Sequence, residues 1–387
     1  MQVSLSGKTT ERLHLYYLDG LRGLAALYVM LFHIHRYMGD ELPVFLLLVG
    51  KVLRYGHFAV VVFIVLSGYV LMLPVVRSQS GCLSGGWLKY FKKRSQRILP
   101  PYYIALVFSL ILGVLIVQLN KFSIFSWHES PDYGEFHPMF SFKDVFTHLL
   151  LIHNFSRSTL GSINSPMWSV AVEWQIYFLF PLLLIPVWRR FNLFLTVLVA
   201  YLIGLAPFYF VKGFDAAHSW FLGLFALGMV ASDIGFSHKP KLIKLRKSLR
   251  WDWLAIVFAV FAFITEWQKL GLDEWISDSF CALATACLLI YCTNCIMLGK
   301  NQPFVLRLFE TRWLVVLGGF SYSLYLTHGA IVTVVGNFLL NLRLSPVTFL
   351  TTFYLVAVPL SVLIAYLFYL AFERPFMSNF LKKNVST

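Results

Sequence analysis

Long apolar stretches, separated by short polar segments, recur from one end of the chain to the other. A transmembrane helix needs about 20 predominantly apolar residues to cross the hydrocarbon core of a bilayer. Ten stretches are long enough, the weakest being 218 to 235, and they cover residues 18 to 38, 57 to 76, 101 to 119, 166 to 187, 191 to 211, 218 to 235, 251 to 267, 276 to 298, 313 to 338 and 346 to 372. The pattern predicts an all-α, polytopic membrane protein with about 10 transmembrane helices.

Polar residues of the first stretch gather on one face of the predicted helix. Arg22 and His33 are eleven residues apart, which at about 100° per residue makes three turns plus roughly 20°. Asp19 falls on the same arc. Titratable side chains are expensive inside a bilayer, so they indicate a functional site. A neutral His33 is a candidate general base; the alternative is a histidine that only packs and hydrogen-bonds between helices.

A second polar face is predicted in the fourth stretch. Ser165, Ser169, Glu173 and Tyr177 recur every four residues, so they share one face of a helix that Ser165 is expected to cap. Measured from opposite ends of their helices, Glu173 and His33 lie at similar depth, so a shared cavity is possible. The alternative is a glutamate that is satisfied by neighbouring hydroxyl groups or by an arginine.

The ninth stretch places Ser321, Tyr325 and His328 at positions i, i+4 and i+7. These residues share a helical face, and His328 reaches a depth similar to that of His33. They are candidates for a supporting role at the same site. The alternative is that they anchor the helix near the membrane interface, as aromatic residues often do.

Composition supports the membrane assignment. Of the 387 residues, 58% are hydrophobic and only 13% are charged, which excludes a soluble domain of this length. The net charge is +14, and most of the 32 lysines and arginines fall in cytoplasmic loops if the N-terminus is placed in the cytoplasm. This distribution predicts that both termini are cytoplasmic. The basic residues therefore indicate topology and contact with membrane lipids, and we expect no nucleic-acid partner.

The segment before the third stretch interleaves aromatic and basic residues at helical spacing, in the run WLKYFKKRSQRILPP. It predicts an interfacial helix on the cytoplasmic face. Arg94 and Arg97 share one face of this helix, and two guanidinium groups can clamp a phosphate. The alternative is that they contact lipid headgroups.

The longest exterior segment, residues 121 to 165, is acidic and aromatic and includes Glu135. It either faces a polar acceptor or forms an ordinary solvated loop. The five cysteines are an odd number, and the CxxC-like run at 292 to 295 has no second ligand pair. We therefore predict no metal site.

Six motifs in sequence resemble the acyltransferase-3 family of membrane proteins. They are LDGLRGLAALYVMLFH, FIVLSGYVL (63 to 71), RSQRILPPYY (94 to 103), SPMWSVAVEWQIYFLFPLL (165 to 183), FSYSLYLTH (320 to 328) and FERPF (372 to 376). Each motif is loose by itself, but together they cover nearly the whole chain in order. The resemblance implies an enzyme that moves an acyl group, usually acetyl, from cytoplasmic acyl-CoA to a hydroxyl of a carbohydrate.

The resemblance also implies roles for individual residues. Arg22 and His33 match the family's arginine and histidine motif, Arg94 and Arg97 match its RxxR element for the acyl donor, and Glu173 matches a conserved-motif glutamate. We expect the supporting residues to be Asp19, Ser169, Tyr177, Tyr325 and His328. His33 either deprotonates the acceptor hydroxyl or first accepts the acyl group itself, and Glu173 orients the imidazole or holds the acceptor.

The expected organisation is one integral-membrane domain over residues 1 to 387, in the plasma membrane (the bacterial inner membrane), with no tightly bound cofactor and acyl-CoA as a donor substrate. Some family members carry an SGNH-type domain after the last helices, and none is expected here, which suggests a stand-alone enzyme or a soluble or membrane partner. The rival interpretation is a transporter or flippase of a polysaccharide or lipid-linked precursor. Inverted repeats or matching broken helices would favour it, and the sequence has neither.

Overall fold

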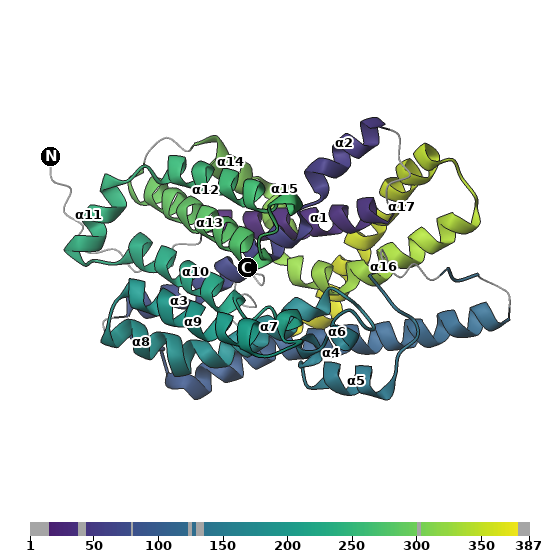
Figure 1. Ribbon diagram of the computed structural model, residues 1–387, viewed down its shortest axis with the longest axis horizontal. Coiled ribbons are helices and arrows are strands. Elements are labelled where there is room, and N and C mark those ends of the chain that lie inside the picture. Colours follow the sequence, from purple (N-terminus) through teal and green to yellow (C-terminus); the bar gives the residue numbers. More distant parts are fainter. Residues whose placement is uncertain are drawn as a thin grey trace, which may run out of the picture.

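The computed structural model describes residues 15–37, 44–78, 80–122, 126–128, 135–299 and 303–377. Within these ranges the secondary structure is helical, and the only extended pairing is an isolated bridge between Phe136 and Asn164. The α-helices (Figure 1) are α1 (Tyr16–Arg36), α2 (Val44–Leu53), α3 (Gly56–Arg77), α4 (Gly86–Lys121), α5 (Phe142–Leu149), α6 (Arg157–Leu160), α7 (Met167–Leu179), α8 (Ile185–Arg190), α9 (Leu193–Phe210), α10 (Phe221–Phe236), α11 (Pro240–Ser248), α12 (Trp251–Thr265), α13 (Glu274–Met297), α14 (Phe304–Phe309), α15 (Arg312–Gly319), α16 (Ser321–Asn341) and α17 (Pro346–Phe368). The all-α prediction is confirmed.

Short 3₁₀ and π segments join or extend these helices. They are the 3₁₀ turns η1 (His153–Phe155), η3 (Asp215–Ala217), η4 (Gln268–Leu270) and η6 (Arg374–Phe376), and the π-helical turns η2 (Phe180–Leu184) and η5 (Tyr369–Glu373). Because η2 links α7 to α8 without a break, the predicted fourth span is helical as far as Arg190.

By length and composition, eight helices among the described residues can cross a membrane, or nine if one bent pair counts as a single span. The eight are Gly50–Arg77, Gly86–Lys121, Met167–Arg190, Leu193–Phe210, Asp215–Phe236, Glu274–Met297, Ser321–Asn341 and Pro346–Phe376. The span that the sequence marked as weakest is therefore among them. The number ten and the side on which the termini lie stay predictions.

Three predicted spans differ from the eight. Helix α1 forms as expected but is not among them, because its charged residues and histidines make it less apolar. The span predicted over 251 to 267 is the 15-residue α12, which meets α11 at an angle of 71°. The span predicted over 313 to 338 is divided at Phe320 into α15 and α16.

The predicted interfacial helix and the third span are one continuous helix. Helix α4 has 36 residues and continues through Pro100 and Pro101. Arg94 and Arg97 therefore lie on the same helix that crosses the bundle. The boundary predicted at Pro101 is wrong.

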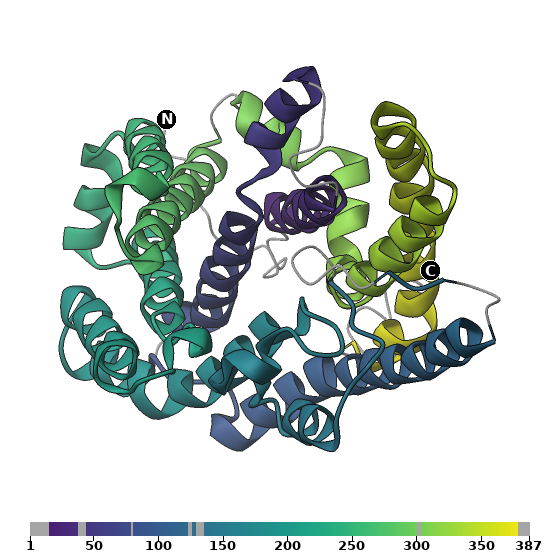
Figure 2. The ribbon, with the colours of Figure 1, turned by 45° about the vertical axis from the view of Figure 1, so that its right-hand side comes forward.

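Helix α1 lies near the centre of the helix bundle (Figure 2), in contact with α3, α15 and α16. A Cβ atom on Gly318 of α15 would overlap the backbone carbonyl of Asp19 in α1. The same kind of contact holds α3 against α10, where a Cβ atom on Gly68 would overlap the carbonyl of Phe225. Small residues let helices approach this closely in a membrane. These contacts fix the helix that carries Arg22 and His33.

A buried hydrogen-bonded group joins α1 to two further helices. The Tyr69 hydroxyl lies 2.6 Å from Thr293 Oγ1, and the Tyr17 hydroxyl lies 2.9 Å from the same atom. All three side chains are fully buried. The group links α1, α3 and α13 at the end of α1 that precedes Arg22.

Part of the exterior segment is folded into the bundle. The Glu135 backbone N–H donates to Thr333 Oγ1 of α16 at 3.1 Å, and Asn164 Nδ2 donates to the Leu326 carbonyl at 2.9 Å. The Ser165 backbone N–H donates to the Glu135 carbonyl at 2.8 Å. Glu135 is consequently buried, so a solvated loop is the wrong description for this part of the segment.

Candidate functional site

The polar arc of α1 borders two pockets, one at each half of the helix. The first pocket, of about 90 Å³, is lined by Arg22 from the N-terminal half together with residues of α3, α4, α7 and α16. The second pocket, of about 440 Å³, is lined by His33 and Arg36 from the C-terminal half. Arg22 and His33 thus serve different pockets, although they belong to one arc of one helix.

Three guanidinium groups meet one carboxylate in the first pocket. Arg22, Arg94 and Arg97 line it together with Glu173. Arg22 Nη1 donates to Asp19 Oδ1 at 3.2 Å, and this contact places Asp19 where the sequence predicted it, beside Arg22. Even with both carboxylates ionised, the cations outnumber the anions. The first pocket therefore attracts an anionic ligand.

Glu173 is held by hydroxyl groups. The Tyr177 hydroxyl donates to Glu173 Oε1 at 2.6 Å, and Ser67 Oγ donates to the same oxygen. The sequence left open whether hydroxyl groups or an arginine would satisfy this carboxylate, and the hydrogen bonds come from hydroxyl groups. Arg94 Nε is buried in the same pocket and has no hydrogen-bond partner in the described part of the chain.

The polar face of α7 is confirmed, with one exception. Ser169, Glu173 and Tyr177 all line the first pocket. Ser165 does not cap the helix, because Pro166 takes the cap position and no side-chain cap hydrogen bond forms there. The Ser165 hydroxyl instead hydrogen-bonds to the Glu135 carboxylate.

His33 is paired with a carboxylate that the sequence did not assign to it. His33 Nδ1 lies 2.7 Å from Glu135 Oε1, and Arg36 Nη1 lies 4.0 Å from the same oxygen. Burial by itself raises the pKa of Glu135, but the charges of His33 and Arg36 and two hydrogen bonds outweigh this effect and lower it to about 2. Glu135 is therefore a carboxylate at neutral pH.

This pairing replaces the expected contact between Glu173 and the imidazole. Glu135 belongs to the folded-in segment, and only the tertiary hydrogen bonds of that segment bring it to His33. The sequence offered little indication of this role, because Glu135 is one acidic residue in a long loop and has no helical spacing that would link it to a partner.

A second histidine lies beside His33. The ring centroids of His33 and His328 are 5.3 Å apart. His328 Nδ1 lies 2.9 Å from the Leu324 carbonyl, so the neutral ring carries its proton on Nδ1 and donates to that oxygen. His328 Nε2 is left as a buried acceptor without a hydrogen-bond partner among the described residues. The sequence predicted a similar depth for His33 and His328, and the structure places the two rings next to each other.

Tyr325 lies between the two pockets. Its ring lines both of them, and only Val60 shares this property among the lining residues. The Tyr325 hydroxyl lies 2.7 Å from Ser169 Oγ, which ties α16 to α7. Ser321 of the same helix lines the first pocket alone. The shared cavity that the sequence made possible for Glu173 and His33 is thus two pockets that share the Tyr325 side chain as a wall.

The second pocket is also lined by residues that the sequence did not single out. His57 and Glu274 line the second pocket with Trp168 and Phe32. Behind them, His57 Nε2 lies 3.4 Å from Glu266 Oε2. Glu266 and Glu274 are acidic residues in or next to predicted spans, which could have marked them as functional. Their partner His57 could not be found in this way, because it lies in another helix more than 200 residues away in sequence.

A comparison with known protein families identifies the family of this chain. The family model of the acyltransferase-3 domain, described as an acyltransferase domain, matches residues 15–370. The chain belongs to the acyltransferase-3 family. The matched range contains every helix of both pockets.

Two relatives of this acyltransferase-3 chain come from Staphylococcus aureus. O-acetyltransferase OatA of strain NCTC 8325 / PS 47 is 24% identical over 381 residues, which are 92% of this chain and 56% of the relative. A putative O-acetyltransferase of strain COL is 22% identical over 396 residues, which are 94% of this chain and 58% of the relative. The chain thus spans little more than half the length of the curated relatives it matches. No solved structure matches it.

The family motifs of this acyltransferase-3 chain converge on the two pockets. The residues matched to the arginine, RxxR and glutamate motifs, Arg22, Arg94, Arg97 and Glu173, line the first pocket, and the motif histidine His33 lines the second. Residues from segments far apart in sequence therefore line two neighbouring pockets that share Tyr325.

Proposed function

We propose that this chain is an integral-membrane O-acyltransferase. It moves an acyl group from acyl-CoA in the first pocket to a hydroxyl of a carbohydrate in the second pocket. The acyl group is acetyl, in keeping with the names of the relatives. The observation that carries the proposal is the placement of three arginines on one side of Tyr325 and a histidine paired with a glutamate on the other.

The donor side is supported by charge and size. Acyl-CoA carries several phosphate charges, and arginine pairs bind phosphate bidentately. Arg94 and Arg97 hold the phosphates, and Arg22 guides the arm that carries the thioester. The volume of about 90 Å³ is too small for the nucleotide. The phosphates therefore approach Arg94 and Arg97 from outside the pocket, and only the acyl end of the donor enters it.

The acceptor side is supported by the second pocket. Its volume of about 440 Å³ lies within the range of about 300–1,000 Å³ that is typical of small-molecule sites. The lining combines the aromatic faces of Trp168 and Phe32 with polar groups, a mixture that suits the apolar faces and hydroxyl groups of a sugar ring.

The chemistry follows from the pairing of His33 with Glu135. With the Nδ1 proton directed at Glu135, Nε2 of the neutral imidazole is free to remove the proton from the acceptor hydroxyl. The resulting oxygen attacks the thioester carbonyl, the carbon–sulfur bond breaks, and the departing CoA thiolate takes the proton from the imidazolium. Glu135 stabilises the imidazolium while it exists. Transient acylation of His33 Nε2 is the covalent variant of the same reaction.

Topology completes the proposal. With the basic segments facing the cytoplasm, the first pocket receives the donor from the cytoplasmic side and the second receives an exported or cell-surface carbohydrate from the other side. The chain then resides in a bacterial inner membrane as a multi-pass protein.

The test is turnover by the purified full chain in lipid nanodiscs, with radiolabelled acetyl-CoA and a panel of glycosides. His33→Ala should lower acyl transfer by about 10²–10⁴-fold, as expected for loss of a general base. Arg94→Ala combined with Arg97→Ala should raise the KM for acetyl-CoA. The matched control is His35→Ala on the same helix, because His35 Nδ1 contacts Tyr354 at 3.2 Å and lines neither pocket.

Two results would contradict the proposal. A fully active His33→Ala protein would remove the assigned base. Carbohydrate movement across proteoliposomes without any consumption of acetyl-CoA would indicate the transporter instead.

A further inference from the structure

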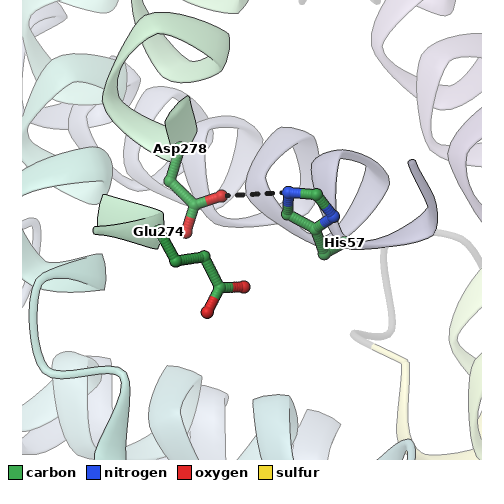
Figure 3. Close-up of side chains that lie close together, drawn as sticks. All are labelled: His57, Glu274 and Asp278. Carbon is green, nitrogen blue, oxygen red and sulfur yellow. Dashed lines mark ion pairs between the residues drawn. The ribbon is translucent and has the colours of Figure 1, made fainter. Parts of the chain in front are cut away.

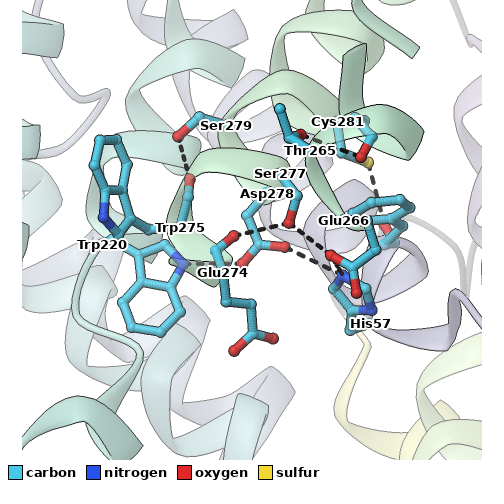
Figure 4. A network of polar contacts seen from close by, with 12 residues as sticks. His57, Trp220, Thr265, Glu266, Glu274, Trp275, Ser277, Asp278, Ser279 and Cys281 are labelled. Carbon is cyan, nitrogen blue, oxygen red and sulfur yellow. Dashed lines mark hydrogen bonds and ion pairs between the residues drawn. The ribbon is translucent and has the colours of Figure 1, made fainter. Parts of the chain in front are cut away.

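A compact group of one histidine and three carboxylates lies outside the residues used in the proposed reaction. It consists of His57 in the first turn of α3, Glu266 at the end of α12, and Glu274 and Asp278 in the first turns of α13 (Figures 3 and 4). We call these four residues the His57 cluster. His57 and Glu274 also line the second pocket.

The geometry of the His57 cluster is that of ligand atoms around a common centre. The side-chain donor atoms of His57, Glu274 and Asp278 all lie within 4.8 Å of one another. His57 Nε2 lies 3.7 Å from Asp278 Oδ1 and 3.4 Å from Glu266 Oε2. Both separations are longer than a good N–H···O hydrogen bond, which is about 2.9 Å. The 3.7 Å between His57 and Asp278 is close to the roughly 3.4 Å between ligand atoms of a tetrahedral site with bonds of about 2.1 Å.

Asp278 provides an independent sign that something is to be bound there. Its side chain is 1% exposed, and its Oδ2 accepts a hydrogen bond of 2.9 Å from the Trp220 indole. Its Oδ1 and His57 Nε2 are both buried without a hydrogen-bond partner in the part of the chain that the structure describes. The two atoms face one another (Figure 3). A buried carboxylate oxygen without a partner is costly unless a cation satisfies it.

The charge of the cluster points the same way. Three carboxylates surround one imidazole, so even a protonated His57 leaves an excess of negative charge. Arg54 acts on Glu266 from the neighbouring turn, and its guanidinium lies over the Tyr55 ring at 5.5 Å. His218, which faces Glu274, has its Nδ1 2.8 Å from the Ala216 carbonyl. None of these groups supplies a cation to the space between His57 and Asp278.

We propose that the His57 cluster binds one divalent transition-metal ion of the zinc type, through His57 Nε2, Asp278 Oδ1 and the Glu274 carboxylate. An imidazole combined with carboxylates suits zinc and its neighbours better than Mg²⁺ or Ca²⁺, which prefer oxygen ligands only. The Trp220 indole orients Asp278 from behind, as outer-shell hydrogen bonds do in metal sites. Glu274 is exposed, so its side chain is free to close on the ion.

The position of this site gives it access to the second pocket. Three protein ligands leave a fourth tetrahedral position open, and two of the three ligands line the pocket that contains His33. A ligand of the bound ion would then reach the space that His33 also lines. The metal site does not depend on the acyl transfer proposed above.

The experiment measures metal directly. The full chain is purified in detergent with an affinity tag that contains no histidine, and its metal content is determined by inductively coupled plasma mass spectrometry. After chelation, Zn²⁺, Mg²⁺ and Ca²⁺ are titrated back separately, and the absorption spectrum of the Co²⁺ form reports the coordination geometry. We expect about one zinc ion per chain, displaced by neither Mg²⁺ nor Ca²⁺.

Matched variants locate the ion. His57→Gln and Asp278→Asn should each weaken zinc binding by on the order of 10²-fold, since each replaces a strong ligand by a weaker neutral amide oxygen. Asp278→Asn keeps the side-chain shape next to Trp220, and its elution as a single folded species separates lost binding from misfolding. The controls are His128→Gln and Asp252→Asn, which make the same changes at residues away from the cluster and should leave zinc binding unchanged.

Three outcomes would overturn the metal site. They are a wild-type chain that takes up no zinc, zinc binding that survives His57→Gln and Asp278→Asn, and Mg²⁺ or Ca²⁺ binding as tight as that of zinc. Each outcome is measured as metal binding and does not require acyl transfer. A failure of the metal site can therefore be distinguished from a failure of the proposed acyltransferase function.

Discussion

At the scale of single residues, the decisive feature is the contact between His33 and Glu135. His33 could be chosen from the sequence because it shares a helical face with Arg22. Glu135 could not be chosen, because no spacing rule connects a loop residue to a helix more than 100 positions away. The physical consequence is that a carboxylate, and not a hydroxyl or a carbonyl, sets the orientation of the imidazole.

The Glu135→Gln substitution tests this contact through catalysis. It keeps the shape of the side chain but removes the charge that stabilises the imidazolium, so acyl transfer should fall by on the order of 10²-fold. The KM for acetyl-CoA should change little, because Glu135 lines only the second pocket. An unchanged turnover number in the assay described above would show that the pairing has no part in the reaction.

The same substitution has an expected pH signature in stability. The pKa of Glu135 in the folded chain is lowered to about 2, below the value of about 4.3 for an ordinary glutamate. Its charge therefore stabilises the folded state fully above pH about 4.3, and this stabilisation is lost as the pH falls toward about 2. The difference in unfolding temperature between wild type and Glu135→Gln should be constant above pH about 5 and shrink below it. A difference that grows on acidification would contradict this assignment.

In the proposed reaction, Tyr325 separates the donor pocket from the acceptor pocket. Tyr325→Ala should join the two pockets, so that water from the second pocket reaches the thioester and acetyl-CoA is hydrolysed without an acceptor. Tyr325→Phe is the matched control, because it keeps the ring and removes only the hydrogen bond to Ser169. The measurement is CoA release in the absence of any sugar, and equal release by wild type and Tyr325→Ala would argue against a wall at this position.

At the scale of elements, apolar periodicity was sufficient to predict most helices, and close packing decided where they break. The stretch over 313 to 338 is long enough for one span, yet one helix ends in it at Gly319 and another begins at Ser321. The contact of Gly318 with the α1 backbone explains why α15 lies where it does. Helix α1, in turn, was predicted from its apolar stretch even though it is less apolar than the eight spans.

Adjacent glycines offer a matched test of this packing. Gly318→Ala would place a Cβ atom onto the Asp19 carbonyl, whereas a Cβ atom at Gly319 has no atom within 4 Å to meet. Overpacking of this kind costs about 1–3 kcal/mol, so Gly318→Ala should lower the unfolding temperature in detergent and Gly319→Ala should not. Equal effects of the two substitutions would mean that α1 and α15 are not in close contact.

At the scale of the whole molecule, the arrangement of charge predicts the orientation of both pockets. The basic segments between helices that follow α3 and α10 lie on the predicted cytoplasmic side. The segment that contains α5 lies on the opposite side in the same prediction. If this orientation holds, the arginines of the first pocket face the compartment that contains acyl-CoA.

Cysteine labelling of intact cells tests this orientation. Cys82, between α3 and α4, is a partly exposed natural cysteine, and it should resist a membrane-impermeant maleimide until the cells are opened. Lys143→Cys in α5, at an exposed position, should react from outside in intact cells. The reverse pattern would place the first pocket on the wrong side for a cytoplasmic donor.

The sequence by itself determined the helices, the membrane environment, the family resemblance and the residues that carry it. These features could be predicted because they depend on local spacing or on composition. An apolar stretch and a helical face are both formed by residues that are neighbours in sequence. The tertiary structure alone decided that Glu135 pairs with His33, that Tyr325 divides the site into two pockets, and that His57 meets Asp278. Such contacts join side chains from segments far apart in sequence, and they exist only once helix packing and the folded-in loop have set the distances between them.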